Sequence, residues 1–210
     1  MKQWKQWCLL CVIVLVLIAV GDFYGCFERT VSGKQFGITD YQSGKDQNEN
    51  GVDDVQDFVA GARNYVESAP VYGSRYYAGG YPNDGYGVCT DVIHHAFIAA
   101  GYSLKQMVDA DIASDPQAYG ITTADPNIDF RRVDNLLVFF SRHAQQLSNR
   151  FDDPFDWQPG DIVIYHQHIG ICSDRRSMQG YPLLIHFDPI GARERDELQN
   201  SKVIGHFRWK

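Results

Sequence analysis

The chain has 210 residues, enough for one domain with a full hydrophobic core. Its formal net charge of −7 at pH 7 excludes the dominant basic surface that nucleic acid requires, so no nucleic-acid partner is expected. Beyond Cys26 the only cysteines are Cys89 and Cys172, which excludes a disulfide-rich scaffold and argues against a zinc site built on thiolate pairs. A single Cys89–Cys172 bridge is the alternative to a free Cys89 thiol.

The N-terminal segment, residues 1–25, has the pattern of a targeting element. Lys2 and Lys5 precede an uncharged and mostly apolar run over residues 6–21, as in a secretory signal or a signal anchor. Aromatic residues bracket the run, as they do at membrane interfaces, which favours an uncleaved transmembrane helix over a cleaved signal peptide. The leading lysines predict that the rest of the chain lies on the extracytoplasmic side of a cell membrane, or is secreted if the segment is removed.

Residues 26–45 are expected to form a linker, and residues 46–57 have the pattern of a calcium loop. Side chains with oxygen atoms stand at loop positions 1, 3, 5, 9 and 12, a glycine stands at position 6, and position 7 offers its carbonyl. The expected ligands of Ca²⁺ are Asp46, Asn48, Asn50, Val52, Asp54 and Asp57. The ion would be structural, because it would fix the start of the next helix. The alternative is a polar turn that caps this helix without a metal ion.

The main domain is expected over residues 54–210 and begins with helices. Apolar residues at helical spacing predict helices over 54–68 and 90–101, and Ser103 is placed to cap a third that runs to residue 112. Residues 69–87 are rich in Gly, Tyr and Pro and are expected to be irregular. A further helix is predicted over 133–147.

Strands are predicted after the helices, over residues 160–165, 169–173, 182–187 and 203–209. Their short connections favour an antiparallel sheet. The order of helices first and strands later predicts an α+β fold, in which N-terminal helices pack on a mainly antiparallel sheet behind the transmembrane helix.

Cys89 is the candidate nucleophile, because it lies at the start of the helix over 90–101. Helix starts carry unpaired N–H groups and a partial positive charge, and both favour the thiolate. His168 opens a strand and is the candidate base. His186 lies on the next strand and is the candidate third residue, because neighbouring antiparallel strands bring side chains within about 5 Å of each other. The backbone N–H of Cys89 is placed to bind an oxyanion.

These assignments have alternatives. In the first alternative, Cys89 is an unreactive residue packed in the core. This is also the interpretation that we favour for Cys172. A metal ion held by His166, His168 and His186 is a further alternative, although the sequence shows no carboxylate pattern beside them. The candidates for substrate contact are Asp91, Tyr81, Arg131 and Arg132. Asp91 alternatively caps its helix, and the arginines alternatively pair with Asp129 or Asp134.

Five motifs together resemble a bacterial envelope family catalogued as domain of unknown function 1287. They are Tyr-x-Gly-Gly-Tyr-Pro (77–82), Gly-Val-Cys-Thr-Asp-Val-Ile (87–93), Asp-Pro-Asn-Ile-Asp-Phe-Arg-Arg-Val-x-Asn-Leu (125–136), Trp-Gln-Pro-Gly-Asp-Ile-Val (157–163) and His-Ile-Gly-Ile (168–171). The cysteine at a helix start, the Pro-Gly-Asp turn and the His-Ile-Gly-Ile strand are also similar to the NlpC-like cysteine peptidases and amidases of the papain-like superfamily. The resemblance covers roughly residues 45–209.

The resemblance implies a papain-like fold and a Cys-His-His site, with the third polar residue at His186. It implies a membrane-tethered, extracytoplasmic cysteine hydrolase, a peptidoglycan amidase or endopeptidase that needs no cofactor for catalysis. Its partners would be peptidoglycan or another cell-envelope polymer, and the membrane through the N-terminal helix. Residue chemistry alone predicts only an extracytoplasmic hydrolase or acyltransferase. The alternative is a catalytically inactive module that binds cell-wall glycans through its tyrosine-rich segment.

Overall fold

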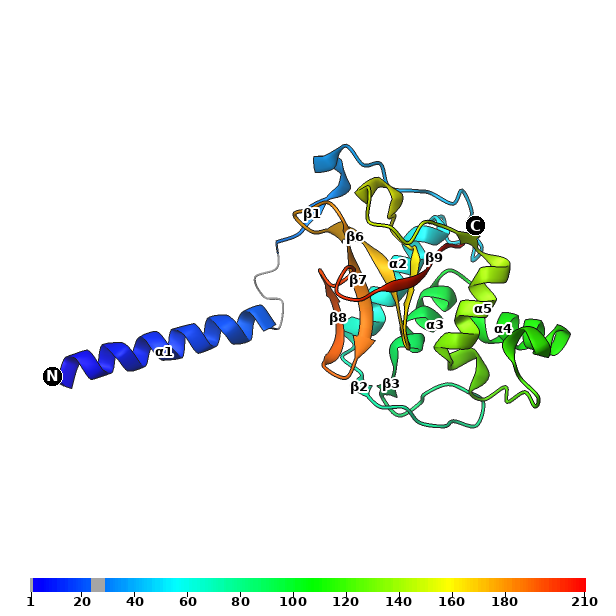
Figure 1. Cartoon of the computed structure of the whole chain (residues 1–210), viewed down its shortest axis with the longest axis horizontal. Helices are drawn as coiled ribbons and strands as arrows, with labels where there is room; N and C mark the ends of the chain where they lie inside the picture. The colour runs from blue at the N-terminus through cyan, green and yellow to red at the C-terminus, as the bar shows by residue number, and fades with distance from the viewer. Residues whose placement is uncertain (1, 24–28) are drawn as a thin grey trace. The chain divides into compact units, whose positions relative to one another are not determined.

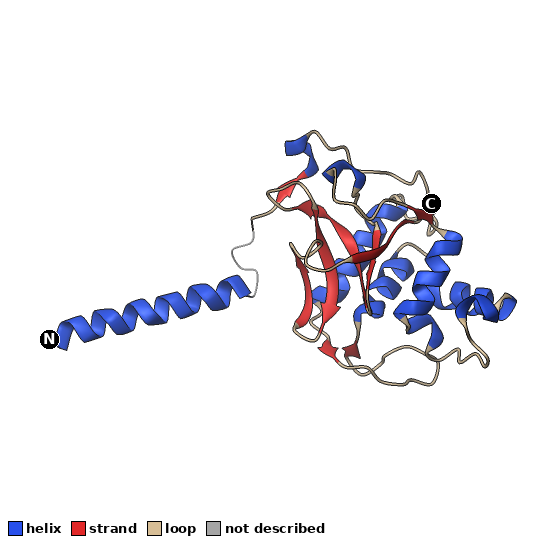
Figure 2. Cartoon of the chain, viewed as in Figure 1, coloured by secondary structure: helices blue, strands red, loops and turns tan. Residues whose placement is uncertain are grey.

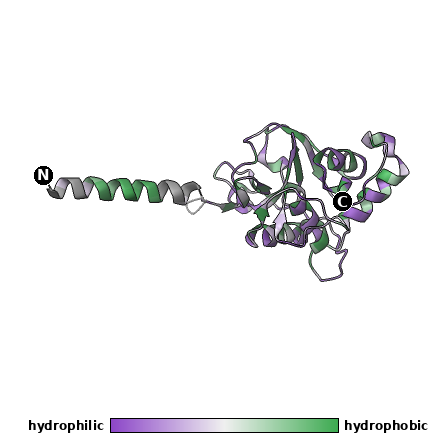
Figure 3. Cartoon of the chain, turned by 90° about the horizontal axis from the view of Figure 1, so that it is seen from below, coloured by the Kyte–Doolittle hydropathy of each residue, from purple (hydrophilic) through white to green (hydrophobic). Residues whose placement is uncertain are grey.

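The computed structural model describes residues 2–23 and 29–210, and the chain forms two units, Met1–Thr30 and Val31–Lys210. The first unit contains one helix, α1 (Lys2–Phe23), which coincides with the predicted targeting segment and is hydrophobic in its middle (Figure 3). Among the described residues, no helix is long and apolar enough to cross a membrane, so the predicted transmembrane helix is not confirmed. The junction predicted between residues 25 and 26 lies outside the described residues.

The second unit is a mixed α+β domain, which confirms the predicted class and the mainly antiparallel sheet (Figure 1, Figure 2). Its main sheet has the strand order β4 (Gln145–Gln146), β9 (Val203–Arg208), β5 (Ile162–Tyr165), β6 (His168–Arg176), β7 (Pro182–Asp188) and β8 (Gly191–Arg195), with β1 (Val31–Ser32) also pairing with β6. Every pair in this sheet is antiparallel. The two-residue strands β2 (Val71–Tyr72) and β3 (Tyr86–Gly87) form a separate parallel pair.

Four helices belong to this domain: α2 (Asp54–Glu67), α3 (Cys89–Ala99), α4 (Leu104–Ser114) and α5 (Val133–His143). Helices α2 and α3 pack together and cover β6 and β7 (Figure 1). They approach closely because residue 61 is glycine, where a Cβ atom would lie 2.5 Å from the Cβ of Ala99. Fully buried residues of α3, such as Ile93, share one core with Ile171 and Ile185 of the sheet. Burial of each such side chain contributes about 1.5–3 kcal/mol, which fixes α3 on the sheet.

The opposite face of the sheet has a smaller core that contains Trp157, Tyr165, Leu184 and Leu198. Asp161, from the Pro-Gly-Asp motif, is fully buried at the edge of this core. Its carboxylate accepts hydrogen bonds from His206 Nε2 at 2.9 Å and Arg208 Nε at 2.7 Å. The motif aspartate therefore ties β5 to β9 and has a structural role.

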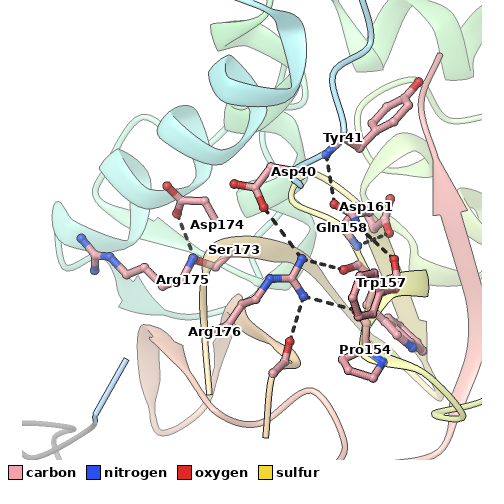
Figure 4. A network of polar contacts seen from close by, with 12 residues as sticks. Asp40, Tyr41, Pro154, Trp157, Gln158, Asp161, Ser173, Asp174, Arg175 and Arg176 are labelled. Atoms are coloured by element: carbon pink, nitrogen blue, oxygen red, sulfur yellow. Dashed lines mark hydrogen bonds and ion pairs between the residues drawn. The ribbon is translucent and has the colours of Figure 1, made fainter. Parts of the chain in front are cut away.

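From Val31 onwards, the segment predicted as a linker (26–45) belongs to the domain. Its anchor is Arg176, which is fully buried and donates to the carbonyls of Gly180 at 2.9 Å and Trp157 at 3.0 Å (Figure 4). The carboxylate of Asp40 lies 3.9 Å from the same guanidinium. A buried cation needs acceptors and an opposite charge, and Asp40 supplies the charge. This requirement explains why a stretch without apolar periodicity is held on the domain.

The short strands β1, β2 and β3 were not predicted, and two larger differences concern the main sheet. The helix predicted over 133–147 ends at His143, because Gln145 and Gln146 pair with β9 as strand β4. Strand β8 was not predicted at all. Its sequence, Gly-Ala-Arg-Glu-Arg, lacks alternating apolar residues because β8 is an edge strand whose residues are all half-buried.

Candidate active site

Cys89 begins α3, and a buried ion pair holds this helix start in place. The Asp91 carboxylate accepts a hydrogen bond from the backbone N–H of Val88 at 2.8 Å. It also accepts from Arg131 Nε at 2.9 Å and Arg131 Nη2 at 2.8 Å. Asp91 therefore caps the helix, as one of the two interpretations of the sequence predicted. Arg131 pairs with Asp91 and not with Asp129 or Asp134.

The side chains of Asp91 and Arg131 are at most 2% exposed and satisfy each other. This pairing favours a structural role, and a substrate contact of either residue stays a prediction. Tyr81 is also directed inward, because its ring stacks on His94 at a centroid distance of 3.8 Å and packs against the main core. Arg132 differs from these three. Its side chain is 61% exposed and lies 3.6 Å from the Asp129 carboxylate, so most of its surface is open to a ligand.

The Cys89 thiol is buried at the end of strand β6, with a residue exposure of 7%. Burial raises its pKa to about 11, although hydrogen bonds from the backbone N–H groups of Ile169 and Thr90 act in the opposite direction. The helix start alone predicted a favoured thiolate. The structure corrects this prediction, because desolvation outweighs the N–H groups, and the resting group at neutral pH is a thiol.

The structure brings His168 and His186 together. His168 is the first residue of β6, and His186 on β7 lies opposite Gly170 in the strand register. The distance between His168 Nε2 and His186 Nδ1 is 2.9 Å, a hydrogen bond. Burial and the neighbouring His186 lower the pKa of His168 to about 4, so its imidazole is neutral at pH 7.

A third polar group, Glu197, continues the chain of contacts. His186 Nε2 lies 2.7 Å from Glu197 Oε2, and this hydrogen bond lowers the pKa of Glu197 to about 2. Sequence reasoning missed Glu197, because it lies in the irregular segment after the unpredicted strand β8. No local pattern separates it from the neighbouring acids Glu194 and Asp196.

The thiol and the histidines approach the end of the sheet from two sides. Side chains alternate along a strand, so His168 lies on the face opposite to Ile169, which packs in the same core as α3. The Cys89 thiol reaches the strand at the backbone N–H of Ile169, the residue next to His168. Among the described residues, no hydrogen bond joins the thiol to the His168 ring. Catalytic hydrogen bonds are often long or misaligned before substrate binds and tighten in the complex.

Comparison with known proteins places these residues in a family. Over residues 59–209 the chain matches the family described as Domain of unknown function (DUF1287). The chain belongs to the DUF1287 family. It is 37% identical over 162 residues to the uncharacterized protein YijF of Escherichia coli (strain K12). The aligned region covers 71% of this chain and 78% of that protein. No solved structure matches the chain. The DUF1287 match includes Cys89, His168, His186 and Glu197.

In this DUF1287 domain, His168 and His186 line a cleft of about 610 Å³. Tyr165, His166, Asp188, Arg193 and Glu197 also line it. His186, Asp188 and Glu197 each offer a possible metal-ligand atom, and these atoms lie within 4.8 Å of one another. The carboxylates that the sequence did not show beside the histidines are therefore present. Arg193, however, pairs with Asp188 at 2.7 Å and with Glu197 at 2.8 Å. Its guanidinium therefore already neutralises the two carboxylates that would bind a metal ion.

The predicted calcium loop precedes the matched DUF1287 residues. The Asp46 carboxylate accepts from the N–H groups of Asn50 and Gly51, and the side-chain amides of Asn48 and Asn50 both donate to Asp57. Four of the predicted ligands are thus linked in one hydrogen-bond network, and Val52 lies in the same loop. Asp54 has other partners, since it accepts from the Gln47 N–H at 2.8 Å and the Tyr102 hydroxyl at 2.6 Å. Calcium binding stays a prediction.

Proposed function

We propose that this DUF1287 protein is an extracytoplasmic cysteine hydrolase that cleaves cell-wall peptide as a peptidoglycan amidase or endopeptidase. The observation that carries the proposal is the 2.9 Å contact of His168 Nε2 with His186 Nδ1, beside the strand end where the Cys89 thiol lies. It leaves Nδ1 of His168 as the free nitrogen of the proposed base. The similarity to the NlpC-like pattern supports the papain-like fold and the substrate class, and both belong to the proposal.

In the proposed reaction, Cys89 Sγ attacks the carbonyl carbon of an amide bond while its proton passes to His168 Nδ1. Both groups are neutral at rest, so the proton moves during the attack. The oxyanion of the tetrahedral intermediate accepts from N–H groups at the start of α3. Collapse expels the amine, which takes the proton from His168 and leaves a thioester. Water, deprotonated by His168, then hydrolyses the thioester and restores the thiol.

The location and the substrate rest on sequence patterns. The basic start and apolar run of residues 1–25 would direct the domain across the bacterial cell membrane. There the available amide polymer is the peptide of the cell wall. Exposed tyrosines of the segment before α3, Tyr72 at 40% and Tyr76 at 61%, offer aromatic surfaces for the glycan. The same surfaces are the basis of the competing function, a module that binds the wall without cleaving it.

A digest of purified peptidoglycan with the full chain and its Cys89→Ala variant tests the proposal. Wild-type protein should release fragments whose new amino and carboxyl ends, read by mass spectrometry, identify the bond cleaved, and C89A should release none. Cys172→Ala is the matched control, because Cys172 is also buried but belongs to the other core. Equal release by wild type and C89A would reject the proposal. Sedimentation of both proteins with peptidoglycan, without release, would favour the binding module.

Calcium is expected to raise the melting temperature of the full chain. The loop over 46–57 ends in the first turn of α2, and a ligand that binds only the folded state at 100 times its Kd stabilises it by about 2.7 kcal/mol. For a domain of this size that corresponds to roughly 5 °C or more. The melting temperature is compared in excess chelator and in millimolar calcium, for wild type and Asp46→Asn. An unchanged melting temperature, or an equal increase in the variant, would contradict calcium binding at this loop.

A further inference from the structure

We infer that Glu197 is a positioning residue that sets the tautomers of His186 and His168, and thereby keeps Nδ1 of His168 free to act as the base. The inference rests on the proposed function for its catalytic meaning, whereas the tautomers themselves are a property of the folded protein. Glu197 touches neither the thiol nor the reacting atoms in the proposed reaction. It acts through His186, to which it is hydrogen-bonded at 2.7 Å.

Glu197 is negatively charged at neutral pH. Its hydrogen bonds with His186 and Arg193 lower its pKa to about 2, so at neutral pH it is a carboxylate and only accepts hydrogen bonds. Arg193 donates to the same Oε2 atom from Nη2 at 2.8 Å, and this Nη2 also donates to Asp188 Oδ2 at 2.7 Å. The carboxylate is therefore oriented by an arginine that is itself paired.

The Glu197 carboxylate fixes the positions of the ring protons on His186 and His168. Because Glu197 accepts, His186 Nε2 carries the hydrogen, and in a neutral ring Nδ1 of His186 is then an acceptor. His168 Nε2 must donate to that acceptor across 2.9 Å. A neutral His168 with its proton on Nε2 has a lone pair on Nδ1. The arrangement thus leaves one defined nitrogen able to receive the thiol proton.

The segment that carries Glu197 is held in place by its neighbour in the chain. The next residue, Leu198, is fully buried in the smaller core. Its carbonyl accepts a hydrogen bond of 2.8 Å from the hydroxyl of Tyr165, the last residue of β5. Glu197 is therefore fixed on the strand that pairs with the start of β6, although its own segment is irregular.

The substitution Glu197→Met is expected to release the proton order. His186 and Arg193 both donate to the same Oε2 atom of Glu197, so a glutamine would keep its oxygen there, whereas methionine offers no comparable acceptor. His186 Nε2 then has no acceptor for its hydrogen, both rings populate Nδ1–H forms, and part of the His168 population loses the base nitrogen. Aspartate at this position keeps an accepting carboxylate and should preserve the original order.

The test is the ¹⁵N NMR spectrum of histidine-labelled full chain, which distinguishes Nδ1–H from Nε2–H tautomers. Wild type and Glu197→Asp should show Nε2–H on both His168 and His186, and Glu197→Met should show a clear Nδ1–H population on both. Glu194→Met is the matched control, because Glu194 is likewise held in ion pairs, with Arg63 and Arg175, and no histidine is among these partners; its spectrum should match wild type. An Nδ1–H tautomer of His168 in wild type, or unchanged tautomers in E197M, would overturn the inference.

Kinetics separate this inference from the proposed function. In peptidoglycan hydrolysis, E197M should lower kcat by about ten-fold or more with little change in KM, E197D should recover part of the loss, and E194M should match wild type. If wild type cleaves and E197M keeps its kcat, the positioning role is refuted while the hydrolase stands. If wild type does not cleave but the tautomers change as expected, the proposed function fails and the tautomer assignment stands.

Discussion

Alanine in place of His168 is expected to lower kcat for peptidoglycan hydrolysis by roughly a thousand-fold, because general acid–base catalysis contributes about 10²–10⁴ in rate. With its pKa lowered to about 4, His168 is neutral and able to take the thiol proton across the neutral range, and no other group in the proposed reaction does this. The loss should appear in kcat, since His168 is not assigned a role in holding the substrate. Turnover is measured by release of soluble fragments from purified peptidoglycan.

His166→Ala is the matched control for this prediction. His166 lies two residues earlier in the β5–β6 turn, lines the same cleft and is exposed, but it has no contact with His186. Its replacement should leave kcat within about three-fold, which is the scale of an exposed residue without a catalytic role. If H166A loses activity and H168A keeps it, the base is His166 and the assignment of His168 is wrong. Melting curves of both variants confirm that they are folded.

Asparagine in place of Asp91 is expected to destabilise the domain by about 3–5 kcal/mol, the usual cost of removing one partner of a buried ion pair. The side chains of Asp91 and Arg131 are 1% and 2% exposed, so the substitution leaves a guanidinium buried without its opposite charge. Asparagine keeps an oxygen for the Val88 N–H, so the change isolates the charge from the helix cap. The free energy of unfolding is measured by urea titration.

Two comparisons make the result specific. Asp152→Asn removes an exposed partner of Arg150, in a pair whose side chains are 62% and 78% exposed, and should cost less than about 1 kcal/mol. The double variant Asp91→Asn, Arg131→Met should be less destabilised than the sum of its single changes, because the unpaired charge is gone. Equal costs for D91N and D152N, or strict additivity, would show that the buried pair does not hold the start of α3.

Local patterns in the sequence were sufficient for much of the fold. The apolar spacing over 90–101 and the glycine before Cys89 predicted α3 and placed the cysteine at its first turn, as found. The short apolar runs predicted β6 and β7 and hence the meeting of His168 with His186. These features depend on neighbours along the chain or on adjacent strands, which is why composition and periodicity reveal them.

What the sequence did not predict depends on distant partners. Arg131 finds Asp91 across 40 positions, and no spacing rule favoured that partner over the nearby Asp129. Strand β8 is recognisable only as an edge of a sheet already formed, so the placement of Glu197 after it had no local signal. The pKa of Cys89 rises because the folded chain removes water from the thiol, and helix position alone says nothing about that burial.

The anchoring of residues 31–41 by Arg176 bears on where the domain begins. The family match starts at residue 59, inside helix α2, whereas the compact unit starts at Val31. A fragment trimmed to the matched boundaries would cut helix α2 in two. It would also remove Asp40 and the backbone that covers Arg176, and so expose a guanidinium that is fully buried in the whole domain. Domain borders drawn from similarity and those drawn from folding thus fall nearly thirty residues apart in this chain.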